Sequence, residues 1–203
     1  MGSRIDYKRE LKALYTASAK ACSITAVPAM NFLMLDGKGN PNGSIEFQNA
    51  VEALFSVAYA LKFMMKKSAD IDYGVMPLEG LWWCDDMAAF TTASKESWQW
   101  TLMIMQPPCI TAEIFSGAVE EVSRKKALAA AEQLVFGAYE EGKTVQILHI
   151  GPFSEEGPTV AKLHQFISEH QYQMNGKHHE IYLSDTRRGQ PENWKTIIRQ
   201  PVR

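Results

Sequence analysis

The stretch HHEIYLSD (178–185) has the alternation of a β-strand, and the fold prediction starts from it. Ile181 and Leu183 alternate with Glu180 and Tyr182 along it. Successive strand side chains point to opposite faces, so one face is apolar and the other carries a carboxylate beside a phenol. This stretch alone does not say whether the second face is in water or inside the protein.

An earlier extended stretch, YGVMPLEGLWW (73–83), matches it. Here Glu79 shares its face with Leu81 and Trp83, which are poor companions for a surface in water. The match indicates that the sheet is apolar on both faces and that Glu79 occupies the position that Glu180 has in the later strand. We therefore expect the two glutamates to lie on the same face.

The order of the predicted elements repeats, which suggests a duplicated βαββ unit within a single domain, 1–203. Short motifs match only loosely between the halves. The predicted parts are an N-terminal helix (5–15), a first repeat at about 27–106, a helical insert at about 111–136 with helices over 111–122 and 125–136, and a second repeat at about 144–202.

Two βαββ units predict an α+β fold with helices on one side of a mostly antiparallel sheet and a concave surface opposite. The simplest geometry has a cleft where the halves meet, lined with aromatic rings and holding Glu79 and Glu180. Concave, mainly apolar sites with a few polar groups typically bind small molecules. The alternative is that both glutamates are rim residues bonded to water or to a lysine.

Composition excludes several classes of protein. The net charge of −2 over 203 residues lacks the basic character of a nucleic-acid-binding surface. The three cysteines form no CxxC pair, so we expect a reducing, cytoplasmic location without zinc or disulfides. The longest apolar stretch (51–65) is too short and too interrupted to span a membrane. The oligomeric state stays open.

We expect neither a metal nor a cofactor. His178 and His179 precede Glu180, but neighbouring strand residues point in opposite directions and no further ligand pattern appears. GKGNPNG (37–43) lacks the spacing of a phosphate-binding loop, and no GxSxG motif is present.

A carboxylate among aromatic rings has two natural uses. Partial burial disfavours its charged form and raises its pKa, which suits a general base or a proton-sharing acid. If it stays ionised, it attracts a flat cation together with the ring faces. The sequence leaves both uses open.

The motifs DYKRELKALY, VPAMNFLMLDGKGNPN, YGVMPLEGLWW, LHIGPFSEEGPT and HEIYLSD together resemble the stand-alone GyrI-like (gyrase-inhibitor-like) small-molecule-binding proteins. The likeness runs from about residue 6 to the C-terminus. It implies a duplicated βαββ fold of the SOUL/heme-binding-protein type with a ligand cleft between the repeats. It also implies that Glu180 faces bulky aromatic ligands. Some stand-alone members hydrolyse cyclopropanoid DNA-alkylating compounds of the yatakemycin and CC-1065 type within an aromatic cage.

The resemblance assigns candidate roles. Glu180 would deprotonate the attacking water, and Tyr182 or His149 would stabilise charge on the substrate's carbonyl oxygen. Trp100 is at least as well explained as ordinary core, and Phe153 equally well as a cap of the adjacent helix. Tyr139, at the end of the insert, would reach over the cleft as a lid. The candidate catalytic residues are Glu180, Tyr182 and His149, and the candidate ligand-binding residues are Glu79, Trp83, Trp100, Tyr139 and Phe153.

Three functions remain open. The first is a detoxifying hydrolase that binds aromatic xenobiotics and opens strained electrophiles. The second is a protein that binds or sequesters aromatic, cationic compounds without turnover. The third, suggested only by the family's name, is inhibition of a topoisomerase.

Overall fold

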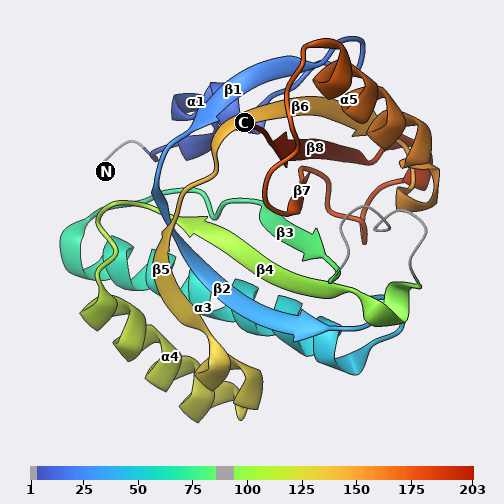
Figure 1. The fold of residues 1–203 in the computed structure, drawn as a ribbon. Coiled ribbons are helices and arrows are strands. Elements are labelled where there is room, and N and C mark those ends of the chain that lie inside the picture. The colour runs from blue at the N-terminus through green and yellow to red at the C-terminus, as the bar shows by residue number, and fades with distance from the viewer. Residues whose placement is uncertain (1–3, 86–93) are drawn as a thin grey trace.

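The structure is a computed structural model that describes residues 4–85 and 94–203 (Figure 1). The helices are α1 (Tyr7–Glu10), α2 (Lys12–Tyr15), α3 (Ile45–Ala69), α4 (Ala112–Lys126) and α5 (Gly157–Glu169). The strands are β1 (Ser23–Val27), β2 (Met30–Lys38), β3 (Leu78–Trp83), β4 (Gln99–Gln106), β5 (Val135–Tyr139), β6 (Gly142–Ile150), β7 (His178–Tyr182) and β8 (Lys195–Pro201).

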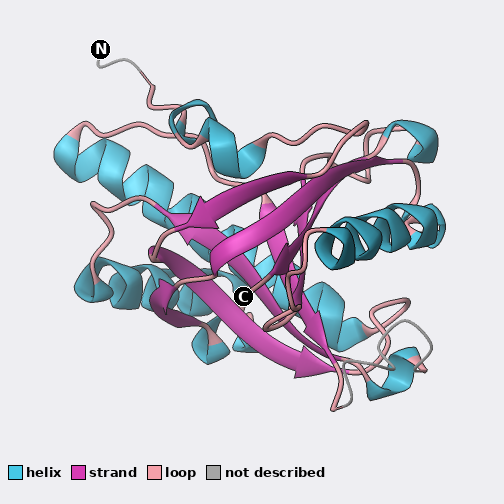
Figure 2. Ribbon diagram, turned by 45° about the horizontal axis from the view of Figure 1, so that its top comes forward, coloured by secondary structure: helices cyan, strands magenta, loops and turns pink. Residues whose placement is uncertain are grey.

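In the described part of the chain, eight strands form one antiparallel sheet in the order β1-β6-β8-β7-β3-β4-β2-β5. The order strand, helix, strand, strand occurs twice, as β2-α3-β3-β4 and β6-α5-β7-β8, and the halves meet where β3 pairs with β7. The sheet curls, and α3, α4 and α5 pack outside it (Figure 2). The predicted α+β class, with antiparallel strands and helices against the sheet, is confirmed.

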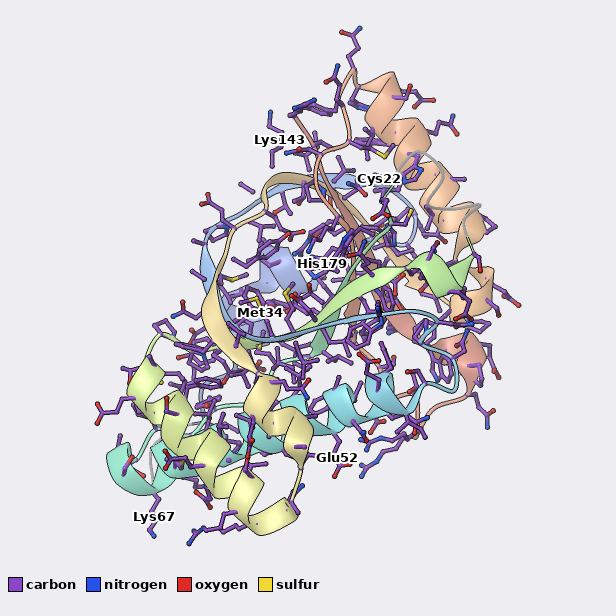
Figure 3. All side chains as sticks on the ribbon, turned by 60° about the horizontal axis from the view of Figure 1, so that its bottom comes forward. Cys22, Met34, Glu52, Lys67, Lys143 and His179 are labelled. Carbon is purple, nitrogen blue, oxygen red and sulfur yellow. The ribbon has the colours of Figure 1, made fainter. Side chains whose placement is uncertain are left out.

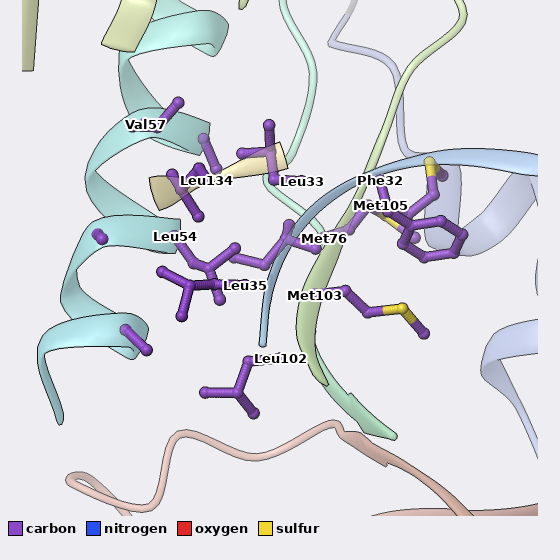
Figure 4. Close-up of a cluster of buried hydrophobic side chains, with 14 of the residues drawn as sticks. Phe32, Leu33, Leu35, Leu54, Val57, Met76, Leu102, Met103, Met105 and Leu134 are labelled. Atoms are coloured by element: carbon purple, nitrogen blue, oxygen red, sulfur yellow. The ribbon is translucent and has the colours of Figure 1, made fainter. Parts of the chain in front are cut away.

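Helix α3 has clear end signals and one apolar face. The Ser44 side chain accepts a hydrogen bond from the backbone N–H of Phe47, and Asp70 ends the helix in the left-handed region, with a φ of 55°. The buried face packs on the outer face of the sheet (Figure 4). The contacting side chains are Leu54 and Val57 from α3 and Leu33, Leu35 and Leu102 from the sheet.

The inner face of the sheet is also apolar. Phe32, Met103 and Met105 point away from α3 (Figure 4) and are at most 3% exposed. Burying one such side chain contributes about 1.5–3 kcal/mol. A sheet that is apolar on both faces agrees with the sequence pattern. In such a sheet, composition does not tell which side chains of a central strand point to which face.

The insert differs from the expectation of a second helix over 125–136. Helix α4 ends at Lys126, and Ala127 adopts the left-handed conformation with a φ of 51°. A 3₁₀ turn over 129–133 follows, and then β5 adds to the sheet beside β2. In β5, Val135, Gly137 and Tyr139 alternate with the residues between them, a period of two that overrides the helical spacing.

The N-terminal segment also departs from the expectation. The helix predicted over 5–15 is two short helices, α1 and α2. Pro28, which has no N–H for a sheet, lies between β1 and β2 and separates the two strands. Leu14 and Tyr15 of α2 are both 5% exposed and pack in the core, so the inner face of the sheet is partly covered as well.

Candidate functional site

The pairing of β3 with β7 decides which face each glutamate occupies. Glu180 lies opposite Gly80, and Glu79 lies opposite Ile181. Directly paired residues share a face and neighbours alternate, so Glu79 and Glu180 lie on opposite faces of the sheet. Our expectation of a shared face, and of one cleft that holds both glutamates, was wrong by one residue of register, which is enough to exchange the two faces. Glu79 lies on the inner face, as expected, and Glu180 lies on the outer face, which the helices cover.

On the inner face, five side chains form what we call the inner charge cluster. The Tyr15 hydroxyl donates to Glu79 Oε1 at 2.7 Å, and His179 Nε2 lies 3.0 Å from Glu79 Oε2. The other ring nitrogen, Nδ1, lies 2.9 Å from Glu141 Oε1. Arg199 Nη1 lies 3.1 Å from Glu141 Oε2. The cluster comprises Tyr15, Glu79, Glu141, His179 and Arg199.

The inner charge cluster is closed to solvent and electrically balanced. The charged side chains of Glu79, Glu141, His179 and Arg199 are each 1% exposed. Burial opposes the charge on His179, but Glu141 and Glu79 outweigh it and raise its pKa to about 9. Figure 3 shows His179 inside the molecule, surrounded by other side chains. Two carboxylates and two cations thus pair one another, although His179 Nε2 meets Glu79 as an ion pair without the geometry of a hydrogen bond.

On the outer face, between α3 and α5, lies a second group that we call the acid–aromatic cluster. The Tyr182 hydroxyl donates a hydrogen bond to Glu180 Oε2 at 2.7 Å, and Trp82 Nε1 donates one to Tyr182 Oη at 3.1 Å. His178 Nε2 lies 3.3 Å from Glu180 Oε1. The cluster comprises Trp82, Phe153, Glu156, His178, Glu180, Tyr182, Trp194 and Thr196.

Gly80 provides the space for these bonds. A Cβ at this position would lie 2.7 Å from Trp82 Nε1 and 3.1 Å from Tyr182 Oη. Because Gly80 is the direct cross-strand partner of Glu180, its lack of a side chain leaves room for the phenol to reach the carboxylate.

Aromatic rings extend the cluster on both sides. The Phe153 ring centroid lies 5.5 Å from that of Tyr182 and 5.2 Å from that of Trp194. On the other side, Phe47 of α3 stacks on Trp82 at 6.0 Å. Phe153 is 42% exposed and forms the outer edge of the cluster. A ligand approaching from solvent therefore meets an aromatic ring before it meets the carboxylates.

The two carboxyl groups of this cluster titrate differently. Burial and then the negative charge of Glu180 raise the pKa of Glu156 to about 9. Burial alone would raise the pKa of Glu180 too, but the hydrogen bonds and charge of His178, with the Tyr182 hydroxyl, lower it. At neutral pH, Glu156 is therefore protonated and Glu180 ionised. Neighbouring carboxyls with separated pKa values are a common acid–base arrangement.

Two oxygens of the cluster have no hydrogen-bond partner. Glu156 Oε1 and Thr196 Oγ1 are buried without a protein partner. Glu156 is 8% exposed and Thr196 1% exposed. Buried polar atoms are rarely left unpaired, so these two can accommodate a polar group of a ligand or a water molecule.

The other candidate residues lie elsewhere. Trp83 is on the inner face, with Lys177 Nζ 3.3 Å from its ring centroid. Tyr139 is also on the inner face, on edge strand β5, with its ring edge-on to Phe32. Neither shares a face with Glu180, so the structure does not gather all of the predicted cage around that residue.

Trp100 and His149 are on the outer face but have packing roles. Trp100 is fully buried, lies over Gly37 and meets Phe47 edge-on. His149 Nδ1 lies 3.0 Å from Thr159 Oγ1, and Nε2 lies 3.2 Å from the Pro152 carbonyl oxygen. Both ring nitrogens of His149 are thus engaged away from Glu180. Of the eight candidates, the structure brings Glu180, Tyr182 and Phe153 together.

Sequence reasoning missed Trp82, Glu156, Thr196 and Gly80. A pairing signal was present: aligning Gly80 with Glu180 would have put Trp82 and Tyr182 on one face. Glu156 stands at the start of α5, where no periodicity marks a site. Thr196 looks like an ordinary strand residue.

The described surface is hollowed at places away from this cluster. Two surface hollows, of about 360 and 350 Å³, lie on α4 and beside Arg4 and Gly74. In the acid–aromatic cluster, the Phe153 ring packs on those of Tyr182 and Trp194. Among the described residues, no three His, Cys, Asp or Glu side chains are grouped to hold a metal ion. Residues 4–85 and 94–203 also contain no helix with the length and apolar character needed to cross a bilayer.

The fold defines a class, that of α+β proteins built from two βαββ halves that share one antiparallel sheet. A family model for the GyrI-like small molecule binding domain matches residues 20–203, so the chain belongs to the GyrI-like family. No protein among those with curated descriptions matches the chain.

Solved structures agree with this family. An uncharacterised conserved protein from Listeria innocua is 41% identical, with a TM-score of 0.89 over 98% of this chain and 100% of that one. Two structures described as hydrolases from Listeria innocua are 40% and 38% identical, with TM-scores of 0.85 and 0.86. These cover 98% and 99% of this chain and 100% of their own.

Proposed function

We propose that this protein binds flat aromatic small molecules at the acid–aromatic cluster and hydrolyses strained electrophiles of the cyclopropanoid DNA-alkylating class. The observation that carries the proposal is Glu180, an ionised carboxylate only 15% exposed among aromatic rings and held by Tyr182 and His178. The two Listeria innocua proteins described as hydrolases, about 40% identical, support a hydrolytic activity. Such an activity protects a cell from alkylating xenobiotics.

The proposed reaction adds water across one bond of the substrate's cyclopropane. Glu180 takes a proton from a water molecule, whose oxygen attacks the cyclopropane CH₂ carbon. The ring C–C bond breaks, and its electron pair moves through the conjugated dienone to make a phenolate. The product carries a new C–OH bond and, once the phenolate is protonated, contains one added water.

Binding would use the aromatic edge of the site. A flat skeleton that stacks on Phe153 and Trp194 exchanges its hydration for ring contacts, and each aromatic pair contributes about 0.5–1.5 kcal/mol beyond the buried area. Stacking also fixes the reactive carbon relative to Glu180, which lowers the entropic part of the barrier. Because the rings contact one another in the structure, entry requires the exposed Phe153 ring to move.

The test is turnover of a cyclopropanoid alkylator by the wild type and by Glu180→Gln. The amide keeps the shape but cannot accept a proton from water, so we expect kcat to fall about 10²–10⁴-fold while tryptophan quenching still reports binding. Glu155→Gln, an exposed neighbour of Glu156, is the matched control and should keep full activity. Turnover that survives Glu180→Gln removes Glu180 from the reaction.

A second function, binding of aromatic cations without turnover, is favoured by the same ionised carboxylate beside ring faces. The test compares the binding of a planar cation with the binding of a neutral molecule of the same shape, to the wild type and to Glu180→Gln. If binding alone is the function, the wild type hydrolyses no cyclopropanoid, and Glu180→Gln weakens the cation about tenfold more than the neutral molecule.

A further inference from the structure

The second carboxyl group of the acid–aromatic cluster has no role in the proposal above. Glu156 lies at the N-terminal end of α5 and is 8% exposed. Glu180 is close enough for its negative charge to raise the pKa of Glu156, while Glu156 Oε1 has no hydrogen-bond partner. The Oε1 atom of this carboxyl group therefore remains available to a bound molecule.

Thr196 makes this opening polar on a second side. It lies on β8 opposite both Tyr182 and His149, and its Oγ1 is buried without a partner. The Thr196 hydroxyl lies near the Glu156 carboxyl group and lowers its pKa, but the two do not have the geometry of a hydrogen bond. A ligand oxygen between them would find two groups able to donate a hydrogen bond, which suits an oxygen that becomes negative during a reaction.

We propose, on the basis of the proposed hydrolase function, that Glu156 is the general acid of this site and gives its proton to the substrate oxygen on which negative charge develops, with Thr196 as the second donor. Glu180 is then the base and Glu156 the acid of one reaction. The substrate class is narrowed to electrophiles whose leaving electron pair ends on an oxygen, such as a conjugated carbonyl.

The protons balance within the pair. Water gives one proton to Glu180 and its hydroxide part to the carbon, while Glu156 gives one proton to the substrate oxygen. After the reaction Glu180 is protonated and Glu156 ionised. Transfer of one proton from Glu180 to the neighbouring Glu156 restores the starting state without any other reactant.

The protonation state agrees with this role. Burial and the negative charge of Glu180 raise the pKa of Glu156 to about 9, against the opposing effects of Thr196 and Lys95. Glu180 is kept ionised by His178 and Tyr182. Across the neutral pH range, Glu156 therefore carries the proton that an acid must give, and Glu180 is ionised as a base must be.

The experiment is the pH dependence of kcat for the wild type and Glu156→Gln. Glutamine has the shape of the neutral carboxyl group but cannot give up a proton, so kcat should fall about 10²–10³-fold. The dissociation constant of the substrate should be nearly unchanged. The wild-type kcat should decline above about pH 9, and the remaining activity of the variant should lack this decline. Thr196→Val should lower kcat less, about tenfold, and Glu155→Gln should change nothing.

The outcomes separate this inference from the proposal on which it rests. If Glu180→Gln is inactive but Glu156→Gln turns over normally, Glu156 is a neutral packing group and the inference is wrong while the hydrolase proposal stands. If both variants are active, both proposals are wrong. A wild-type profile that stays flat through pH 9 contradicts the inference even where Glu156→Gln fails to fold.

Discussion

The inner charge cluster and the acid–aromatic cluster lie on the two faces of the same pair of strands. His179 and Glu180 are neighbours in β7, yet one belongs to each cluster. In the inner cluster every carboxylate meets a cation, and the charged side chains are 1% exposed. In the outer cluster the two carboxyl groups are neighbours, and two oxygens lack hydrogen-bond partners.

The difference indicates where chemistry can take place. Fully paired charges stabilise a single arrangement, because any change leaves a buried charge alone. Partly paired groups keep hydrogen-bonding capacity for a bound molecule and hold their protons at unusual pKa values. The inner cluster therefore anchors α2 and the strands, and the outer cluster is the place for ligand chemistry.

The largest expected effect comes from breaking the inner cluster. Arg199→Met removes the cation that contacts Glu141 and also the donor to the Leu14 carbonyl oxygen, at 2.5 Å. Leaving a buried carboxylate with one cation fewer should lower the free energy of unfolding by about 3–5 kcal/mol. Urea unfolding measures this free energy. The control is Arg188→Met, which removes an exposed ion pair with Asp185 and should cost less than about 1 kcal/mol.

An unfolding midpoint of Arg199→Met close to that of the wild type would contradict the structural role given to the inner cluster. It would also remove the contrast between the two faces, since a cluster that tolerates loss of its cation is not tightly paired.

A smaller effect on stability is expected at Gly80, where the rings of the acid–aromatic cluster occupy the space of a missing side chain. Gly80→Ala puts a methyl group 2.7 Å from Trp82 Nε1 and 3.1 Å from Tyr182 Oη. The rings must shift, which should cost about 1–3 kcal/mol of stability and weaken ligand binding about tenfold. Gly157→Ala, where nothing lies within 4 Å of an added Cβ, is the matched control for both measurements. Equal behaviour of the two variants would mean that the outer cluster adjusts freely.

The pH dependence of stability sharpens the comparison further. Glu156 has a raised pKa in the folded protein, so its contribution is fully present below about pH 4.5 and is lost as pH rises through about 9. His179 in the inner cluster also has a raised pKa, and its contribution is lost as pH rises through about 9 from an unfolded value near 6.5. Between pH 5 and 6, where His179 is charged in both states, the slope comes largely from Glu156.

Glu156→Gln should therefore flatten the dependence between pH 5 and 6 and raise the free energy of unfolding at pH 8 by roughly 1–3 kcal/mol. Chemical denaturation at a series of pH values measures both. Curves of the two proteins that run parallel from pH 5 to 8 would show that Glu156 ionises normally in the folded state.

The sequence predicted local patterns well and long-range pairing poorly. Alternation correctly put Glu180 with Tyr182 and, separately, Glu79 with Trp83. It could not say which of Glu79 and Gly80 lies opposite Glu180, because that register is set by the pairing of strands about a hundred residues apart.

Two other features lay beyond the reach of periodicity. A central strand that is apolar on both faces, as β3 is, gives no composition signal to separate Trp82 from Trp83. Glu156 is a helix-end residue whose role depends on Glu180 from another element. Strands β1 and β5 were missed for a related reason: their partners, β6 and β2, are distant in the chain.

The smallest effect on stability, with a larger one on binding, is expected at the outer edge of the acid–aromatic cluster. Phe153 is 42% exposed, so Phe153→Ala should lower the free energy of unfolding by only about 1 kcal/mol, well below the 3–5 kcal/mol typical of a buried Phe. Because its ring contacts Tyr182 and Trp194, the same change should weaken a planar aromatic ligand about five- to tenfold, as measured by tryptophan quenching. Val135→Ala, at an edge-strand side chain that is 59% exposed on the other face, is the control and should leave binding unchanged. If Val135→Ala weakens the ligand and Phe153→Ala does not, the ligand binds on the inner side of the sheet, and the roles of the two faces must be exchanged.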